Sequence, residues 1–303
     1  MKKIILLSIV FLAISSCKKE NQENGKLNIV TTTTMITDLV KNIGGDHINL
    51  QGLMGSGVDP HLYKASEGDV TKLVNADIIF YNGLHLEGKL VEVFEKMESQ
   101  TKTPIALAEE IDKSTLIGSD YFAFNYDPHV WFNIAYFKQF AKKVTQVLSE
   151  KDPKNAENYS ENEKQYLIKL DALQENIKAT IETLPQEKRI LVTAHDAFNY
   201  FGKNYAFEVV GLQGLSTATE AGVQDVQKLA AFIIDKKVKA IFVESSVPKR
   251  TIEALQAAVK SKGHEVIIGG TLFSDALGNA GTIEGTYIGM FEYNVNTIVN
   301  ALR

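Results

Sequence analysis

Short apolar runs alternate with longer amphipathic segments along most of the 303-residue chain, and this plan repeats in its two halves. A short apolar run between turn residues is typical of a buried strand, whereas apolar positions three to four residues apart indicate a helix. Predicted strands cover residues 27–30, 48–54, 77–81, 105–107, 189–193, 207–210, 240–243 and 265–268. Predicted helices cover residues 69–75, 132–148, 223–235, 249–262 and 285–302, and another ends at the glycine pair Gly44 and Gly45.

Alternation of strands with helices argues for parallel sheets that carry helices on both faces. We therefore predict an α/β fold with two lobes, each built on a mostly parallel sheet flanked by helices. The first lobe covers residues 27–153 and the second covers residues 185–303. About 287 residues remain once a leader peptide is removed, which is enough for two domains of ordinary size.

The segment between the two halves, residues 154–184, is predicted to form one long helix. Its apolar positions recur at a mean interval of about 3.6 residues, which is the period of an amphipathic helix. Pro153 and Pro185 mark its ends. A helical connector is stiffer than a flexible linker, so we expect limited motion between the lobes. The apolar positions are Tyr166, Leu170, Leu173, Ile177, Ile181 and Leu184.

The N-terminus predicts export and a lipid anchor. Two lysines precede an apolar run at residues 4–14, which is shorter than the about 20 residues that a membrane-spanning helix needs. The pattern fits a signal peptide covering residues 1–16. Cys17, the only cysteine, follows small residues as in a bacterial lipobox and is the expected lipidation site. Residues 17–26 would form a solvated tether that holds the protein outside the cytoplasm, in the periplasm or at the cell surface.

Composition and charge exclude some classes of partner. The proportions of hydrophobic residues (45%) and charged residues (23%) are those of a soluble globular protein. A formal net charge of −5 argues against nucleic acid as a partner, because binding to nucleic acid needs a basic face. No later apolar stretch approaches the length of a membrane span, so the lipid would be the only anchor. We expect the protein to be a monomer.

Four potential metal ligands lie in four separate loops: His61, His129, His195 and Asp275. Three imidazoles and one carboxylate are sufficient to coordinate a divalent transition metal. The intervals between them are 68, 66 and 80 residues, which excludes a local metal-binding finger. His61, His195 and Asp275 follow predicted strands, and His129 stands close to the start of a predicted helix. Since loops converge at the carboxyl ends of parallel strands, we expect the site in the cleft between the lobes.

An Asp-Pro dipeptide precedes both His61 and His129. Proline restricts its own backbone and that of the residue before it, and a site built from loops needs such rigidity. Taken singly, a histidine in a loop is more often a surface residue or a hydrogen-bonding group than a metal ligand. Asp275 could equally be the N-cap of a helix that starts at Ala276. We assign simple surface or hydrogen-bonding roles to the remaining histidines, His47, His85 and His264.

Six stretches of the chain resemble the metal-binding receptors of bacterial ABC transporters for zinc and manganese, the TroA-type family. They are GVDPHLY at 57–63, YNGLHLE at 81–87, DPHVWF at 127–132, VTAHDAF at 192–198, FVESS at 242–246 and LFSDA at 272–276. The resemblance covers nearly the whole mature chain. It implies two α/β lobes joined by one long helix, with metal held by His61 and His129 of the first lobe and His195 and Asp275 of the second. It also implies an ABC permease and its ATPase subunits as partners, and no enzymatic activity.

The ligand types favour zinc as the cargo and leave manganese as the alternative. Family members that resemble manganese or iron receptors often have a glutamate where this chain has His195, and imidazole suits zinc better than hard manganese. Dedicated zinc receptors often have a histidine-rich acidic loop before the second ligand. The corresponding segment of this chain, residues 112–126, contains no histidine. Glu220 and Glu244 are candidates for holding the histidine rings in their metal-binding tautomer.

Two other classes of protein remain open on the sequence. A zinc-dependent hydrolase also uses histidines and a carboxylate, but it needs an open coordination position, and the chain has no His-Glu-x-x-His helix. An adhesin or structural lipoprotein would need no metal at all. Tight 1:1 metal binding that stabilises the fold would argue against this second class.

Overall fold

The computed structural model describes residues 25–98, 104–119 and 126–303. The predicted signal peptide at residues 1–16, the predicted lipidation site Cys17 and most of the predicted tether at 17–26 lie outside the described residues. None of the helices in the described ranges combines the length and the apolar character that a membrane crossing requires.

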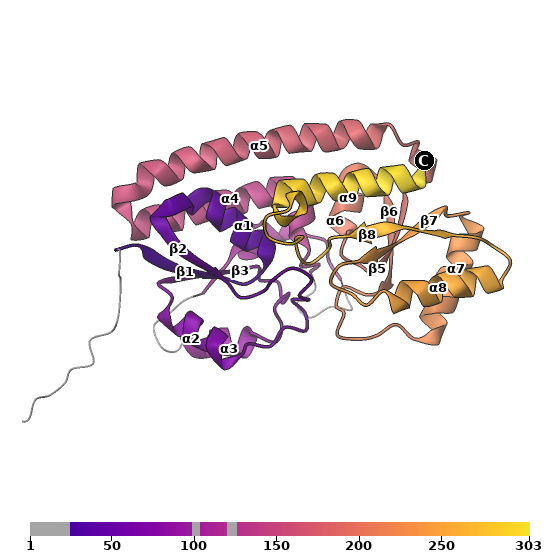
Figure 1. Ribbon diagram of the computed structural model, residues 1–303, viewed down its shortest axis with the longest axis horizontal. Helices are drawn as coiled ribbons and strands as arrows, with labels where there is room; N and C mark the ends of the chain where they lie inside the picture. The colour runs from indigo at the N-terminus through magenta and orange to yellow at the C-terminus, as the bar shows by residue number, and fades with distance from the viewer. Residues whose placement is uncertain (1–24, 99–103, 120–125) are drawn as a thin grey trace, which may run out of the picture.

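The first half of the chain forms a four-stranded sheet in which all neighbouring strands are parallel. In spatial order the strands are β2 (Ile48–Gly52), β1 (Leu27–Thr31), β3 (Ile78–Tyr81) and β4 (Ile105–Ala106). One face is covered by α1 (Thr34–Gly44) and α4 (Ile134–Lys151), and the other by α2 (Glu67–Asn75) and α3 (Val91–Glu98) (Figure 1). Successive residues of β1 serve the two faces, with Ile29 in one buried cluster and Val30 in another.

The second half repeats the plan with two pairs of parallel strands, β5 (Ile190–His195) with β6 (Glu208–Gln213), and β7 (Ala240–Glu244) with β8 (Ile267–Leu272). Strands β5 and β7 lie next to each other. The helices of this half are α6 (Asn199–Tyr205), α7 (Val223–Asp235), α8 (Arg250–Ser261) and α9 (Tyr287–Leu302). Buried side chains of α7 and α8, such as Leu229 and Leu255, pack with Val192 of β5.

One helix of 27 residues, α5 (Ala156–Glu182), runs along both halves (Figure 1). At about 1.5 Å per residue it is about 40 Å long. It packs against α4, α1 and α9, and five of the six predicted apolar positions are buried along it, while Leu184 is buried just beyond its end. This confirms the predicted α/β architecture with a long connecting helix. Short 3-10 turns join the elements: η1 (Gly45–His47), η2 (Leu107–Glu110), η3 (Lys113–Thr115), η5 (Val130–Phe132), η6 (Pro153–Asn155), η7 (Gln186–Lys188) and η8 (Ile283–Gly285).

The largest hydrophobic cluster is continuous across the two lobes. It contains Leu39 of α1, Phe137 of α4 and Leu170 of α5 together with Phe198 and Phe291 from the second half. A smaller cluster lies under α2 and α3, and another under α7 and α8. Because the large cluster is shared, a hinge motion that separates the lobes along their whole contact would expose buried aromatic side chains.

The structure differs from the sequence-based elements at several points. Strand β5 continues to His195, so this residue ends the strand instead of following it by two residues. Strand β8 begins at Ile267 and extends through Gly269 and Gly270, whose low strand propensity hides its continuation. Helices α3 and α6 were not predicted, and at eight and seven residues they are too short to show a clear period.

Candidate metal centre

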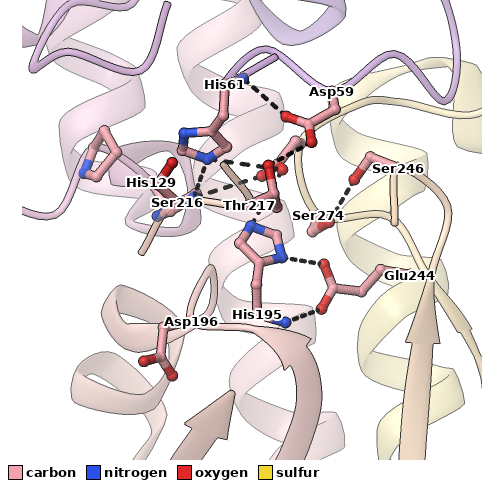
Figure 2. A network of polar contacts seen from close by, with 12 residues as sticks. Asp59, His61, His129, His195, Asp196, Ser216, Thr217, Glu244, Ser246 and Ser274 are labelled. Atoms are coloured by element: carbon pink, nitrogen blue, oxygen red, sulfur yellow. Dashed lines mark hydrogen bonds and ion pairs between the residues drawn. The ribbon is translucent and has the colours of Figure 1, made fainter. Parts of the chain in front are cut away.

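Four side chains meet where the loops of the two halves face each other. Figure 2 labels the three histidines among them. His61 lies in a turn after β2, His129 directly precedes η5, and His195 is the last residue of β5. Asp275 lies in a bend three residues after β8 and is not a helix N-cap, because no helix follows it directly. All four residues are buried, with exposed fractions between 0% and 5%. Two of them come from each half of the chain.

The donor atoms of these residues are arranged closely enough to share one ion. Each residue offers one ligand atom, and the four atoms lie within 4.8 Å of one another. His61 Nε2 is 3.3 Å from His129 Nε2, and the two oxygens of Asp275 lie 3.6 Å from His129 Nε2 and 3.2 Å from His195 Nε2. Metal–ligand bonds of about 2.0–2.1 Å in a tetrahedron place the ligand atoms about 3.3 Å apart. The separations of 3.2–3.6 Å match this spacing, whereas His61 Nε2 lies 4.0 Å from Asp275 Oδ2, so these two groups must move closer to bind one tetrahedral ion.

The carboxylate of Asp275 gives an independent sign that a cation fits here. Both of its oxygens are buried and face ring nitrogens of the other candidate ligands, with His195 Nε2 3.2 Å from Oδ2 and His129 Nε2 3.6 Å from Oδ1. A buried carboxylate is costly, because it has lost the hydration that it has in water. A cation at the centre of the four side chains would compensate that cost.

Two of the three imidazoles are oriented by carboxylates on their far side. His129 Nδ1 lies 2.7 Å from Asp127 Oδ1, and His195 Nδ1 lies 2.6 Å from Glu244 Oε2. Glu244 also accepts a hydrogen bond from the backbone N–H of His195 at 2.9 Å. A proton held on Nδ1 leaves the lone pair of Nε2 facing the centre, which is the tautomer that binds metal.

The two glutamates proposed from the sequence have different positions. Glu244 is buried at the end of β7, with its carboxylate against the ring of His195. Glu220 lies on the surface with an exposed side chain and forms an ion pair with Arg250 at 3.6 Å, so the structure does not place it behind a histidine. The sequence reasoning missed Asp127 as an orienting group, although the repeated Asp-Pro-His motif was the signal that could have indicated it.

The electrostatic environment differs among the four residues. Burial lowers the pKa of His61 to about 3, so this imidazole is neutral at physiological pH. Burial on its own would raise the pKa of Asp275, but the neighbouring histidines, His195 first, hold the pKa of that carboxyl below its usual range. Burial would likewise lower the pKa of His195, but Asp275 and Glu244 raise it well above its usual value. In the metal-free site this shift favours the doubly protonated ring of His195, so an arriving cation would compete with the proton on Nε2.

The remaining histidines lie apart from this cluster. His47 makes an edge contact with the ring of Tyr159, with the ring centroids 6.2 Å apart. His85 lines a separate pocket with Tyr81 and Glu87, and His264 lies in the turn before β8. Among the described residues, His61, His129, His195 and Asp275 form the only group of this composition that converges on one point.

Comparison with known proteins identifies the family. The family described as "Zinc-uptake complex component A periplasmic" matches residues 29–301. The chain is 49% identical over 284 residues to "Zinc-binding protein TroA" of Treponema pallidum, covering 94% of this chain and 91% of that protein. It is 44% identical over 308 residues to "Manganese-binding lipoprotein MntA" of Bacillus subtilis, covering 100% of both.

A solved structure agrees with these sequence matches. The structure of the periplasmic zinc-binding protein TroA from Treponema pallidum superposes with a TM-score of 0.89 at 49% identity and covers 92% of this chain and 99% of that chain. The chain therefore belongs to the zinc-uptake component A family, the metal-binding receptors of bacterial ABC transporters.

Proposed function

We propose that the protein binds one divalent transition-metal ion through His61, His129, His195 and Asp275 and delivers it to an ABC permease for uptake. The observation that supports this most directly is the convergence of four buried donor atoms within 4.8 Å of one another. Two relatives are named for zinc binding and for manganese binding, so either ion is compatible with the family. The metal is cargo in this proposal, and the loops of both lobes must separate to release it.

We propose zinc as the favoured cargo, with manganese as the alternative. Three imidazoles suit zinc, and the separations between the donor atoms are close to those of a tetrahedral zinc site. The second oxygen of Asp275 also faces the centre, so the carboxylate can bind through both oxygens and give manganese the higher coordination that it prefers.

The N-terminal pattern and the relatives support a proposal for the cellular setting. The relative from Bacillus subtilis is named as a lipoprotein. We propose that Cys17 carries the lipid that holds this protein at the membrane, outside the cytoplasm, next to the permease and its ATPase subunits. We propose that it acts there as a monomer with no catalytic step.

A metal analysis of the purified full-length protein tests the proposal. The expected result is about one zinc per chain, with zinc displacing manganese in competition. Loss of a group that only orients a metal ligand lowers metal affinity by roughly 10- to 100-fold. His195→Ala removes a ligand itself and should lower zinc affinity by more than this. His264→Ala, in the turn before β8, is the matched control and should bind as the wild type does. Unchanged zinc affinity in His195→Ala would show that the ligand set is wrong.

A further inference from the structure

The two Asp-Pro-His turns of the first lobe each contain the same type of internal hydrogen bond. In each, one oxygen of the aspartate accepts the backbone N–H of the histidine two residues later. The distance is 2.8 Å from Asp59 Oδ1 to His61 N and 2.9 Å from Asp127 Oδ1 to His129 N. The aspartate therefore fixes the backbone of the metal-binding histidine in both turns.

The other oxygen of each aspartate accepts a hydrogen bond from the second lobe. Thr217 Oγ1 donates to Asp59 Oδ2 at 2.5 Å, across 158 residues of sequence (Figure 2). Asn199 Nδ2 donates to Asp127 Oδ2 at 3.0 Å. Each aspartate thus connects a proposed metal ligand of one lobe to a side chain of the other.

The two connections have different surroundings. Asp127 is fully buried, its carbonyl oxygen also accepts a hydrogen bond from the hydroxyl of Tyr200, and Tyr200 belongs to the hydrophobic cluster that both lobes share. Asp59 is only partly buried, and Thr217 belongs to an irregular loop at residues 214–222. Within this loop, all of which the structure describes, Thr217 is the only buried residue.

Separating Asp127 from Asn199 would also pull Tyr200 out of the hydrophobic cluster that both lobes share. Separating Asp59 from Thr217 would break one hydrogen bond and move the loop at residues 214–222. Gln213 Nε2 donates to the carbonyl oxygen of Thr219 at 3.2 Å and holds the base of that loop to the end of β6. The side of the site next to His61 is therefore the side that can open without separating the lobes.

We propose that Thr217 is a positioning residue whose hydrogen bond to Asp59 fastens the loop at residues 214–222 over the metal site and sets the rate of metal release. This inference rests on the proposed function. The hydroxyl acts through Asp59 on the backbone of His61 and does not touch the metal. Its loss should therefore affect how fast the bound ion leaves more than how fast an ion enters.

The test is the rate of zinc release from loaded protein into an excess of a chelator, measured by stopped flow. Thr217→Val removes the hydroxyl and should accelerate release by about tenfold, the lower end of the range for one hydrogen bond to a charged group, because Asp59 is only partly buried. Thr217→Ser retains the hydroxyl and should release zinc at the wild-type rate. Thr219→Val makes the same chemical change at an exposed position of the same loop and is the matched control.

A second measurement separates fastening of the loop from general destabilisation. Hydrogen exchange of the amides at residues 214–222 should become faster in zinc-loaded Thr217→Val but not in Thr217→Ser, and the association rate should change less than the release rate. Equal release rates in wild type and Thr217→Val would overturn this inference and leave the proposed function intact. A wild-type protein that binds neither zinc nor manganese would overturn both.

Discussion

Glu244→Gln tests whether the carboxylate behind His195 tunes the site. Glu244 is buried, with one oxygen 2.6 Å from the ring Nδ1 of His195 and the other accepting the backbone N–H at 2.9 Å. Both contacts require an acceptor, but glutamine has only one acceptor oxygen and would turn an NH₂ group toward the other N–H. The substitution also removes the negative charge that favours a proton on Nδ1.

The size of the effect follows from the loss of one hydrogen bond to a charged group, which is about 1.5–3 kcal/mol. That corresponds to about a 10- to 100-fold loss of zinc affinity, the range expected for a group that orients a metal ligand. Competition with a chromophoric chelator at pH 7 measures it. Glu220→Gln is the matched control, because Glu220 is exposed and pairs only with Arg250 among the described contacts. Equal affinities for wild type and Glu244→Gln would refute the assigned role.

Two further predictions concern protons and the shared core. Since Asp275 and Glu244 raise the pKa of His195 in the metal-free protein, zinc must displace a proton, and affinity should rise by about tenfold per pH unit from pH 6.5 upward until that raised pKa is reached. By the same shift, the stability that protonated His195 contributes to the metal-free protein is complete below about pH 6.5 and is lost as the pH rises through the raised pKa. Chelator competition and thermal melts across this pH range measure both, and an affinity independent of pH would contradict the assignment. Leu170→Ala on α5 should lower the free energy of unfolding by about 2–5 kcal/mol in urea while preserving one transition, whereas separate unfolding of the lobes would contradict a shared core.

The sequence was most informative where structure depends on local spacing. The long connecting helix was predictable because Tyr166, Leu170 and their successors recur with a helical period, and these side chains are buried along α5 in the structure. The alternation of strands and helices predicted the parallel sheets for the same reason. The candidate ligands were recognisable because strand ends and helix starts bring distant loops to one edge of a sheet.

What the sequence did not reveal depends on contacts between distant residues. Both Glu220 and Glu244 were candidates from the sequence, but only the packing of β7 beside β5 brings Glu244 against His195. The hydrogen bond between Asp59 and Thr217 joins positions 158 residues apart and has no local signature. Likewise, the predicted lobe boundaries did not indicate that one hydrophobic cluster would run through both lobes, because that depends on how α4, α5 and α9 pack together.

The central claim is tested most directly by a crystal structure of the zinc-loaded protein with anomalous data at the zinc edge. The account predicts one strong peak between the lobes, bonded to Nε2 of three histidines and to the carboxylate of Asp275 at about 2.0–2.2 Å. The histidines are His61, His129 and His195, and their donor atoms already lie close together in the structure. A peak at any other position, or these side chains left apart in protein that contains zinc, would contradict it.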